Sequence, residues 1–343
     1  MSEVKDFRLW VSRLKAGLLI LLAALLTPGF ASTANAADVL PATADLLSRS
    51  LFQVESAVVP NGRTVAYLGD TRSGSGVMLD QYTVLTIGYL LLEADEVDLA
   101  GASGRVFPAS VAAYDHASGL GLIRSALPLD GISIRFGDSA NIAESEYLLS
   151  MGAGDDEPTE VVVVSRRQFT GSWEYMLDKA IYTFPPVENW SGSALTNKRG
   201  ELVGIGSLMV DTVSESQPGI AGNMFVPIDL LKPILADLKS TGKRRGPPQP
   251  WLGLSTEMVD NNLVAVRVSP DGPADSAGVE PGDQILQVAS QEVRDQPSFY
   301  RHLWQAGSAG DAITLTVSRN GRKLEFSVQA VDRMTYLKRP EGV

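Results

Sequence analysis

Residue types that bind metals or act as strong nucleophiles are scarce in this sequence. It contains no cysteine and only two histidines, His116 and His302, so the thiolate and imidazole ligands that zinc prefers are few. The acidic run Asp155-Asp156-Glu157 supplies carboxylates, but a calcium loop needs more oxygen ligands at fixed spacing. We therefore expect no metal and no cofactor, and we expect the acidic run to be a solvated loop.

The composition is that of a folded and acidic protein. Of the 343 residues, 44% are hydrophobic and 20% are charged, and this length allows two folded domains beside a targeting segment. The net charge of −11 argues against nucleic acid or an anionic membrane as a partner.

Residues 1–36 have the organisation of a secretory signal peptide. A basic stretch with Arg8, Arg13 and Lys15 precedes an apolar run at 16–26, and a series of small residues ends at Ala36. Cleavage after Ala36 would deliver the chain to the periplasm, with no stable membrane insertion afterwards. An uncleaved membrane anchor is the alternative, but the apolar run is shorter than the roughly 20 residues that a spanning helix needs.

Short apolar runs separated by Gly, Asn, Asp and Pro dominate residues 50–226, which is typical of antiparallel strands in a sandwich or barrel. The clearest expected strands are 76–79, 84–87, 96–99, 105–113, 121–124, 160–164 and 201–208. Leucine and isoleucine at helical spacing predict a helix at 228–239, which would close this first domain.

A second, smaller module is expected after a linker. The stretch 239–250 is rich in Gly, Pro, Lys and Arg and has few apolar residues, which indicates a connection between domains. Beyond it, the sequence predicts strands, one helix at 297–305 and a hairpin whose turn is Asn320-Gly321. This is the pattern of a small α+β domain, and we expect a loose tail from residue 335 on.

Several motifs, in order and at matching spacing, resemble the HtrA/Deg family of trypsin-like serine proteases. They cover nearly all of the mature chain: Gly74-Ser75-Gly76-Val77, Val84-Leu85-Thr86, Phe136-Gly137-Asp138-Ser139, Ser191-Gly192-Ser193-Ala194 and Phe225-Val226-Pro227. The resemblance implies a mainly β fold, namely a trypsin-like double β-barrel followed by a small α+β PDZ domain. The domains expected from it are 37–240 for the barrels, 241–250 for the linker, 251–332 for the PDZ domain and 333–343 for a tail.

The catalytic triad that the resemblance implies is degenerate. Tyr89 stands at the position of the catalytic histidine, and Gly119 stands at the position of the aspartate that orients it. Only Ser191 remains, as a vestigial nucleophile. Asn189 replaces the glycine of the oxyanion-hole position, where it could still adopt a positive φ.

Other residues could in principle serve as the base. Tyrosine has an ordinary pKa near ~10, so Tyr89 is a poor base at neutral pH. His116 is better explained as a solvent-facing loop residue, and Lys198 as part of the turn Asn197-Lys198-Arg199-Gly200.

The PDZ-like module keeps the residues that the resemblance assigns to peptide binding. Such domains bind an extended peptide along a strand edge and hold its terminal carboxylate with backbone amides. The expected peptide-binding residues are Trp251, Leu252, Gly253 and Leu254 in the loop, and Tyr300, Leu303 and Trp304 on the following helix. The helix residues have an alternative explanation as core.

These observations favour a catalytically inactive HtrA-like protein of the bacterial cell envelope. It would bind polypeptides or protein C-termini through its PDZ domain as an adaptor, a scaffold or a chaperone-like factor, and it could be a homo-oligomer. Two alternatives stay open: a serine endopeptidase that uses Ser191 with a non-standard base, and a regulatory subunit of an active protease paralogue.

Overall fold

The structure, a computed structural model, describes residues 36–340. The predicted signal peptide, apart from Ala36, therefore lies outside the described residues. From residue 37 on, the chain forms one compact unit.

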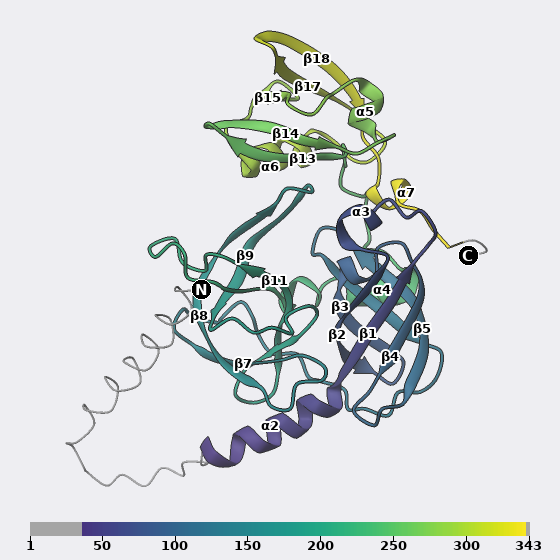
Figure 1. Cartoon of the computed structure of the whole chain (residues 1–343), viewed down its shortest axis with the longest axis vertical. Coiled ribbons are helices and arrows are strands. Elements are labelled where there is room, and N and C mark those ends of the chain that lie inside the picture. The colour runs from purple at the N-terminus through teal and green to yellow at the C-terminus, as the bar shows by residue number, and fades with distance from the viewer. Residues whose placement is uncertain (1–35, 341–343) are drawn as a thin grey trace, which may run out of the picture. The chain divides into compact units, whose positions relative to one another are not determined.

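Alternating apolar and polar residues build the first barrel. In β1 (Leu51–Val58), Phe52 and Val54 are buried whereas Gln53 and Glu55 face solvent, as the two-residue period of a strand requires. Six strands close in the order β1-β2-β3-β6-β5-β4, and Figure 1 shows most of them side by side. Their bounds are β2 Thr71–Asp80, β3 Thr83–Ile87, β4 Ala94–Ala100, β5 Val106–Asp115 and β6 Leu120–Ser125.

A second six-stranded barrel follows in the order β10-β11-β12-β9-β8-β7. Its strands are β7 Tyr147–Met151, β8 Thr159–Gly171, β9 Tyr175–Phe184, β10 Ala194–Thr196, β11 Leu202–Val210 and β12 Gly222–Pro227. The longest pairing is the β8–β9 hairpin, whose tip is the three-residue turn 172–174. This turn proves important for the candidate site.

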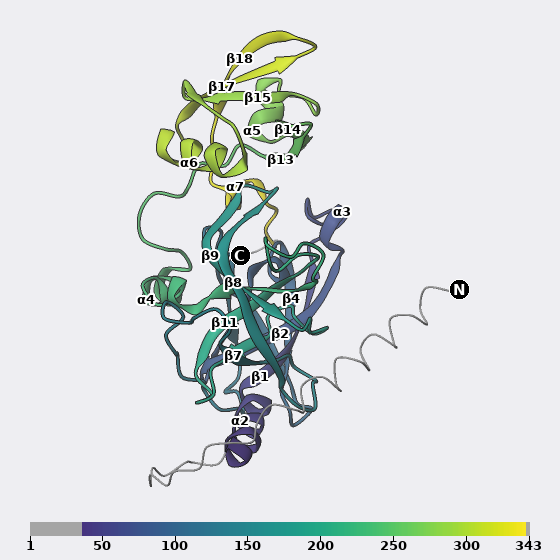
Figure 2. The ribbon, with the colours of Figure 1, turned by 90° about the vertical axis from the view of Figure 1, so that its left-hand side faces the viewer.

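The last hundred residues form a separate antiparallel sheet with helices beside it (Figure 2). The strand order is β13-β14-β15-β17-β18, with β16 paired to β15, so β13 lies at an edge of the sheet. The bounds are β13 Leu254–Val259, β14 Asn262–Val268, β15 Gln284–Val288, β16 Gln291–Glu292, β17 Ala312–Arg319 and β18 Arg322–Gln329; the helices are α5 Pro273–Ala277 and α6 Gln296–Ala306.

The fold class predicted from the sequence, two barrels and a small α+β domain, is confirmed. The predicted hairpin turn at Asn320-Gly321 is confirmed too, with both residues at positive φ. The predicted helix at 228–239 is not continuous: a 3₁₀ turn, Ile228–Leu230, precedes α4 (Leu235–Thr241). Two helices that the sequence pattern did not indicate are α2 (Ala36–Ser50) and the short α3 (Val65–Leu68).

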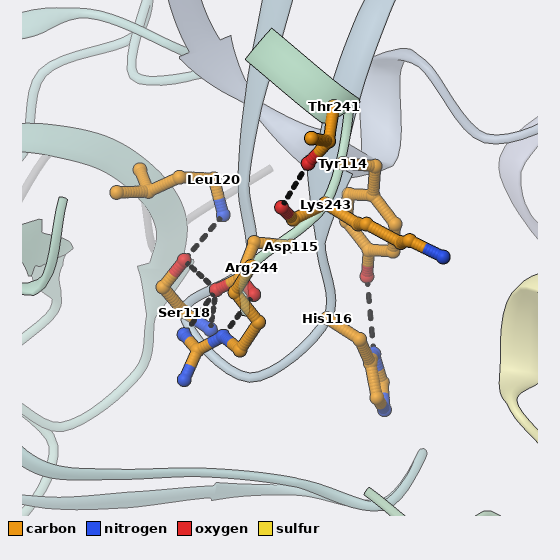
Figure 3. A network of polar contacts seen from close by, with 8 residues as sticks. All are labelled: Tyr114, Asp115, His116, Ser118, Leu120, Thr241, Lys243 and Arg244. Atoms are coloured by element: carbon orange, nitrogen blue, oxygen red, sulfur yellow. Dashed lines mark hydrogen bonds and ion pairs between the residues drawn. The ribbon is translucent and has the colours of Figure 1, made fainter. Parts of the chain in front are cut away.

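The expected linker is tied to the first barrel. Arg244 donates from two guanidinium nitrogens to the buried carboxylate of Asp115, at 2.5 and 2.6 Å. The same carboxylate accepts hydrogen bonds from the backbone N–H and the hydroxyl of Ser118 (Figure 3). A segment with few apolar residues is thus held in place by a charge-assisted pair.

The expected loose tail is packed for part of its length, so that expectation is wrong for residues 333–338. Arg333 begins α7 (Arg333–Tyr336), and both Arg333 and Leu337 are buried. Tyr336 packs on Trp251, and the backbone N–H of Lys338 donates to Glu93 at 2.8 Å. Within residues 36–340, no helix is both long enough and apolar enough to cross a membrane.

We predict that Arg244→Gln lowers the free energy of unfolding by about 1–3 kcal/mol, because it leaves the buried Asp115 carboxylate without its cation. The neighbouring Arg245 is the matched control, since it pairs with Asp237 on the surface and is 88% exposed. Arg245→Gln should change the stability by less than about 0.5 kcal/mol. Chemical unfolding of both variants checks this, and equal losses would contradict it.

Candidate functional site

Ser191 lies on a tight loop that is held against the first barrel. Its carbonyl oxygen accepts a hydrogen bond from the backbone N–H of Ser75 in β2, at 2.7 Å. The next residue, Gly192, has a φ of +73°, and a Cβ there would lie 1.9 Å from the carbonyl oxygen of Ser75. Only glycine fits at residue 192, so the sequence itself forces Ser191 into this position.

Tyr89 is the side chain that contacts the Ser191 hydroxyl. It lies in the 3₁₀ turn Gly88–Leu90 after β3, and its phenolic oxygen is 2.8 Å from Ser191 Oγ and 3.0 Å from the carbonyl oxygen of Ser207. That carbonyl can only accept, so the phenol must keep its proton to make this contact.

Burial raises the pKa of Tyr89 to about 12. A phenolate would also face the Ser207 carbonyl oxygen without a proton between them. Both effects make Tyr89 a poor acceptor for the Ser191 proton at neutral pH.

The side chain of Tyr175 fills the space beside Gly119. A Cβ on Gly119 would lie 2.7 Å from the phenolic oxygen of Tyr175, and the φ of Gly119 is +73°. The Tyr175 hydroxyl donates to the carbonyl oxygen of Ser118 at 2.7 Å. A neutral phenol from β9 therefore occupies the space in which an acidic side chain at residue 119 would have to lie.

Asn189 does not adopt the left-handed conformation that we considered for it, since its φ is not positive. Its side-chain amide donates to Asp155, and the other carboxylate oxygen of Asp155 accepts from the backbone N–H of Gly152 at 2.7 Å. Part of the acidic run predicted as a solvated loop thus holds the segment before Ser191. No cluster of residues that could hold a metal ion occurs in the described part of the chain.

His116 is not solvent-facing, contrary to our expectation. Its half-buried ring lies 3.1 Å from three groups: the Tyr114 hydroxyl, the carbonyl oxygen of Glu174 and the Arg333 guanidinium. Burial and the neighbouring Arg333 hold the pKa of His116 well below its usual range. Lys198 is exposed in the 197–200 turn, 6.0 Å from the ring centre of Tyr147.

A cavity of about 370 Å³, lined mainly by apolar and aromatic side chains, adjoins Tyr89. Six aromatic residues contribute to it: Tyr67, Tyr89, Tyr114, Trp173, Tyr175 and Trp190. Tyr89 both lines this cavity and contacts the Ser191 hydroxyl, so we treat the cavity as part of the same site.

The loop expected to bind a peptide carboxylate already holds a carboxylate of this chain. The backbone N–H groups of Leu252, Gly253 and Leu254 donate to the side chain of Glu174 at 2.9, 2.7 and 2.8 Å. Gly253 has a φ of +84°, which aligns three consecutive donors on one side of the loop. Glu174 comes from the tip of the β8–β9 hairpin.

Sequence reasoning missed Glu174. The residue is 1% exposed, and burial raises its pKa to about 7 although the three N–H donors act in the opposite direction. Nothing in its local sequence, Ser172-Trp173-Glu174, distinguishes it from an ordinary polar turn residue. The role of Glu174 becomes visible only in the folded structure, where the hairpin contacts the loop at 252–254.

The remaining residues expected at the peptide site belong to the core of the PDZ-like domain or pack against other side chains. Tyr300 and Leu303 are fully buried, and Trp304 stacks on Tyr300 with ring centres 5.5 Å apart. The Tyr300 hydroxyl reaches the hairpin, where it donates to the carbonyl oxygen of Gly171 at 2.6 Å. The Trp251 ring packs on Tyr336, with ring centres 4.7 Å apart.

The raised pKa of Glu174 predicts a pH effect on stability. The titratable groups around it are the Arg333 guanidinium, which is charged, and the Tyr300 phenol and the His116 ring, which are neutral at pH 7. A folded-state pKa of about 7, above the ordinary 4.5, means that the folded protein holds this proton more tightly than the unfolded chain.

The wild type should therefore lose on the order of 2–3 kcal/mol relative to Glu174→Gln as the pH rises from about 4.5 to 8. Urea unfolding of both proteins at several pH values measures this difference. Parallel stability curves would contradict the assignment.

Two family models match the chain. The trypsin-like peptidase domain matches residues 74–205, and the PDZ domain matches residues 250–330. Among curated proteins, the chain is 24% identical to the serine protease Do-like HtrA of Lactobacillus helveticus, over 83% of this chain and 74% of that protein. It is 29% identical to the serine endoprotease DegS of Haemophilus influenzae, over 64% of this chain and 65% of that protein.

Solved structures agree with this fold. The HtrA-type protease AlgW with a tripeptide has a TM-score of 0.53 at 20% identity, covering 89% of this chain and 98% of that one. The serine endoprotease from Yersinia pestis has a TM-score of 0.52 at 21% identity, covering 90% and 99%. The chain thus matches a trypsin-like peptidase domain followed by a PDZ domain, and its sequence is similar to that of HtrA/Deg serine proteases.

Proposed function

We propose that this chain is a catalytically inactive HtrA-like protein that binds polypeptides or their C-termini through its PDZ domain. It would act as an adaptor, a scaffold or a chaperone-like factor. The single observation that carries the proposal is the phenol of Tyr89 on the Ser191 hydroxyl, where a serine protease needs a base.

The space around Ser191 supports this proposal. A protease triad needs a base that accepts the serine proton and an acid that orients the base. Here the contacting group is a phenol whose pKa is raised to about 12, and the Tyr175 phenol fills the space beside Gly119. Neither group carries charge at neutral pH.

The loop at 252–254 supports the peptide-binding part. Three convergent backbone donors form a carboxylate site, which is the device by which PDZ domains hold a peptide C-terminus. The related structure of AlgW is described as a complex with a tripeptide, so a peptide is the ligand that we propose here.

We further propose that the protein works in the cell envelope. Several curated relatives are described as periplasmic endoproteases of the DegP type, and residues 1–36 have the organisation of a signal peptide. A regulatory subunit of an active protease would occupy the same compartment and would be recognised by stable co-assembly with that protease.

We predict that the purified protein neither cleaves unfolded casein nor reacts with a fluorophosphonate probe above the level of Ser191→Ala. Loss of a triad serine or histidine lowers turnover on the order of 10⁶-fold, so any cleavage should be within background. Labelling that disappears in Ser191→Ala would overturn the proposal.

A second prediction separates a phenolate mechanism from background hydrolysis. If Tyr89 were the base, the rate would rise with pH toward the Tyr89 pKa of about 12 and would vanish in Tyr89→Phe. We expect Tyr89→Phe and the wild type to show the same rate from pH 6 to 10. Intrinsic fluorescence confirms that both proteins are folded at each pH.

A further inference from the structure

We propose that the tip of the β8–β9 hairpin is an internal ligand of the PDZ groove, in which the Glu174 side chain occupies the place of a peptide's terminal carboxylate. A C-terminal peptide then binds only by displacing this hairpin. This inference rests on the proposed peptide-binding function, and it specifies how that site is regulated.

The hydrogen bonds of the Glu174 carboxylate are the first observation that supports an internal ligand. One oxygen of Glu174 accepts from Gly253 and Leu254, and the other accepts from Leu252. All three N–H groups of the loop are therefore used. A buried donor makes one good hydrogen bond, so a second carboxylate cannot enter while Glu174 stays.

The hydrogen bonds along the edge strand β13 are the second observation that supports an internal ligand. The backbone N–H of Thr256 in β13 donates to the carbonyl oxygen of Ser172 at 3.1 Å, as it would to a peptide lying along this edge strand. The side-chain amide of Gln296, at the start of α6, donates to the carbonyl oxygen of Thr256. Both backbone groups of Thr256 that an incoming peptide would pair with are thus occupied.

Helix α6, on the other side of the groove, also contacts the hairpin. The Tyr300 hydroxyl in α6 donates to the carbonyl oxygen of Gly171 and accepts from the backbone N–H of Glu174 at 3.2 Å. Met176 packs against the apolar core of the PDZ domain. The contacts made by residues 171–176 therefore span the loop, the edge strand and the helix.

Self-occupation lowers the apparent affinity for any peptide. When only a fraction of molecules has an open groove, the measured Kd is the intrinsic Kd divided by that fraction. Removing the internal carboxylate raises the open fraction and should tighten peptide binding, which is the opposite of what loss of a direct peptide contact would do.

The test measures binding of a fluorescein-labelled decapeptide with an apolar last residue and a free C-terminal carboxylate, by anisotropy, to the full chain. Glu174→Ala should bind at least tenfold more tightly than the wild type. Tyr300→Phe, which removes only the hydroxyl that holds the hairpin, should shift the Kd in the same direction by a smaller factor. Asp178→Ala is the matched control, since Asp178 is an exposed carboxylate on the same hairpin, and its Kd should equal that of the wild type.

Glu174→Gln keeps the shape of the side chain and carries the same test if Glu174→Ala fails to fold; it should tighten binding at least threefold. The same decapeptide with a C-terminal amide should bind every variant more weakly. Equal affinities for the wild type, Glu174→Ala and Glu174→Gln would overturn the internal ligand but leave peptide binding intact. Absence of binding by every variant would overturn both proposals.

Discussion

A buried carboxylate must find hydrogen-bond donors, and this requirement organises the contact between the two halves of the protein. Glu174 has no charged partner at hydrogen-bond distance, and the donors it finds are three backbone amides of a loop 78 to 80 residues further along the chain. Leaving a buried carboxylate without hydrogen bonds costs more free energy than most surface contacts contribute. The buried position of Glu174 is therefore favourable only when the hairpin turn contacts the loop. Arg333 and His116 then pack around the same turn.

The side chains that make hydrogen bonds around Ser191 in the barrel site are hydroxyl groups. Tyr89 and Tyr175 each supply a neutral donor that is satisfied by a carbonyl oxygen. A triad stores a carboxylate and an imidazole in partly buried positions, which lowers stability unless each is well paired. The phenols of Tyr89 and Tyr175 carry no such cost, and their rings line a cavity together with other aromatic side chains.

The strands of residues 50–226, the small α+β module and the hairpin at Asn320-Gly321 could be predicted from the sequence pattern, because alternation and turn residues act over short distances. The double barrel and the PDZ domain were expected from the resemblance to the HtrA/Deg family. The role of Glu174 could not be predicted, since its partners lie far along the chain, and neither could the packing of Tyr336 or the pairing of Arg244 with Asp115. Local pattern cannot show which buried group a distant polar residue meets.

The contacts around Gly119 limit which side chains residue 119 can carry. A Cβ at that position meets the phenolic oxygen of Tyr175 at 2.7 Å, and one at Gly88 meets the ring of Tyr114 at 2.2 Å. At each glycine, an aromatic side chain from a strand thus occupies the space that a Cβ would need. An acidic side chain at residue 119 would have to displace the buried Tyr175 phenol, and a variant without that ring would contain a void.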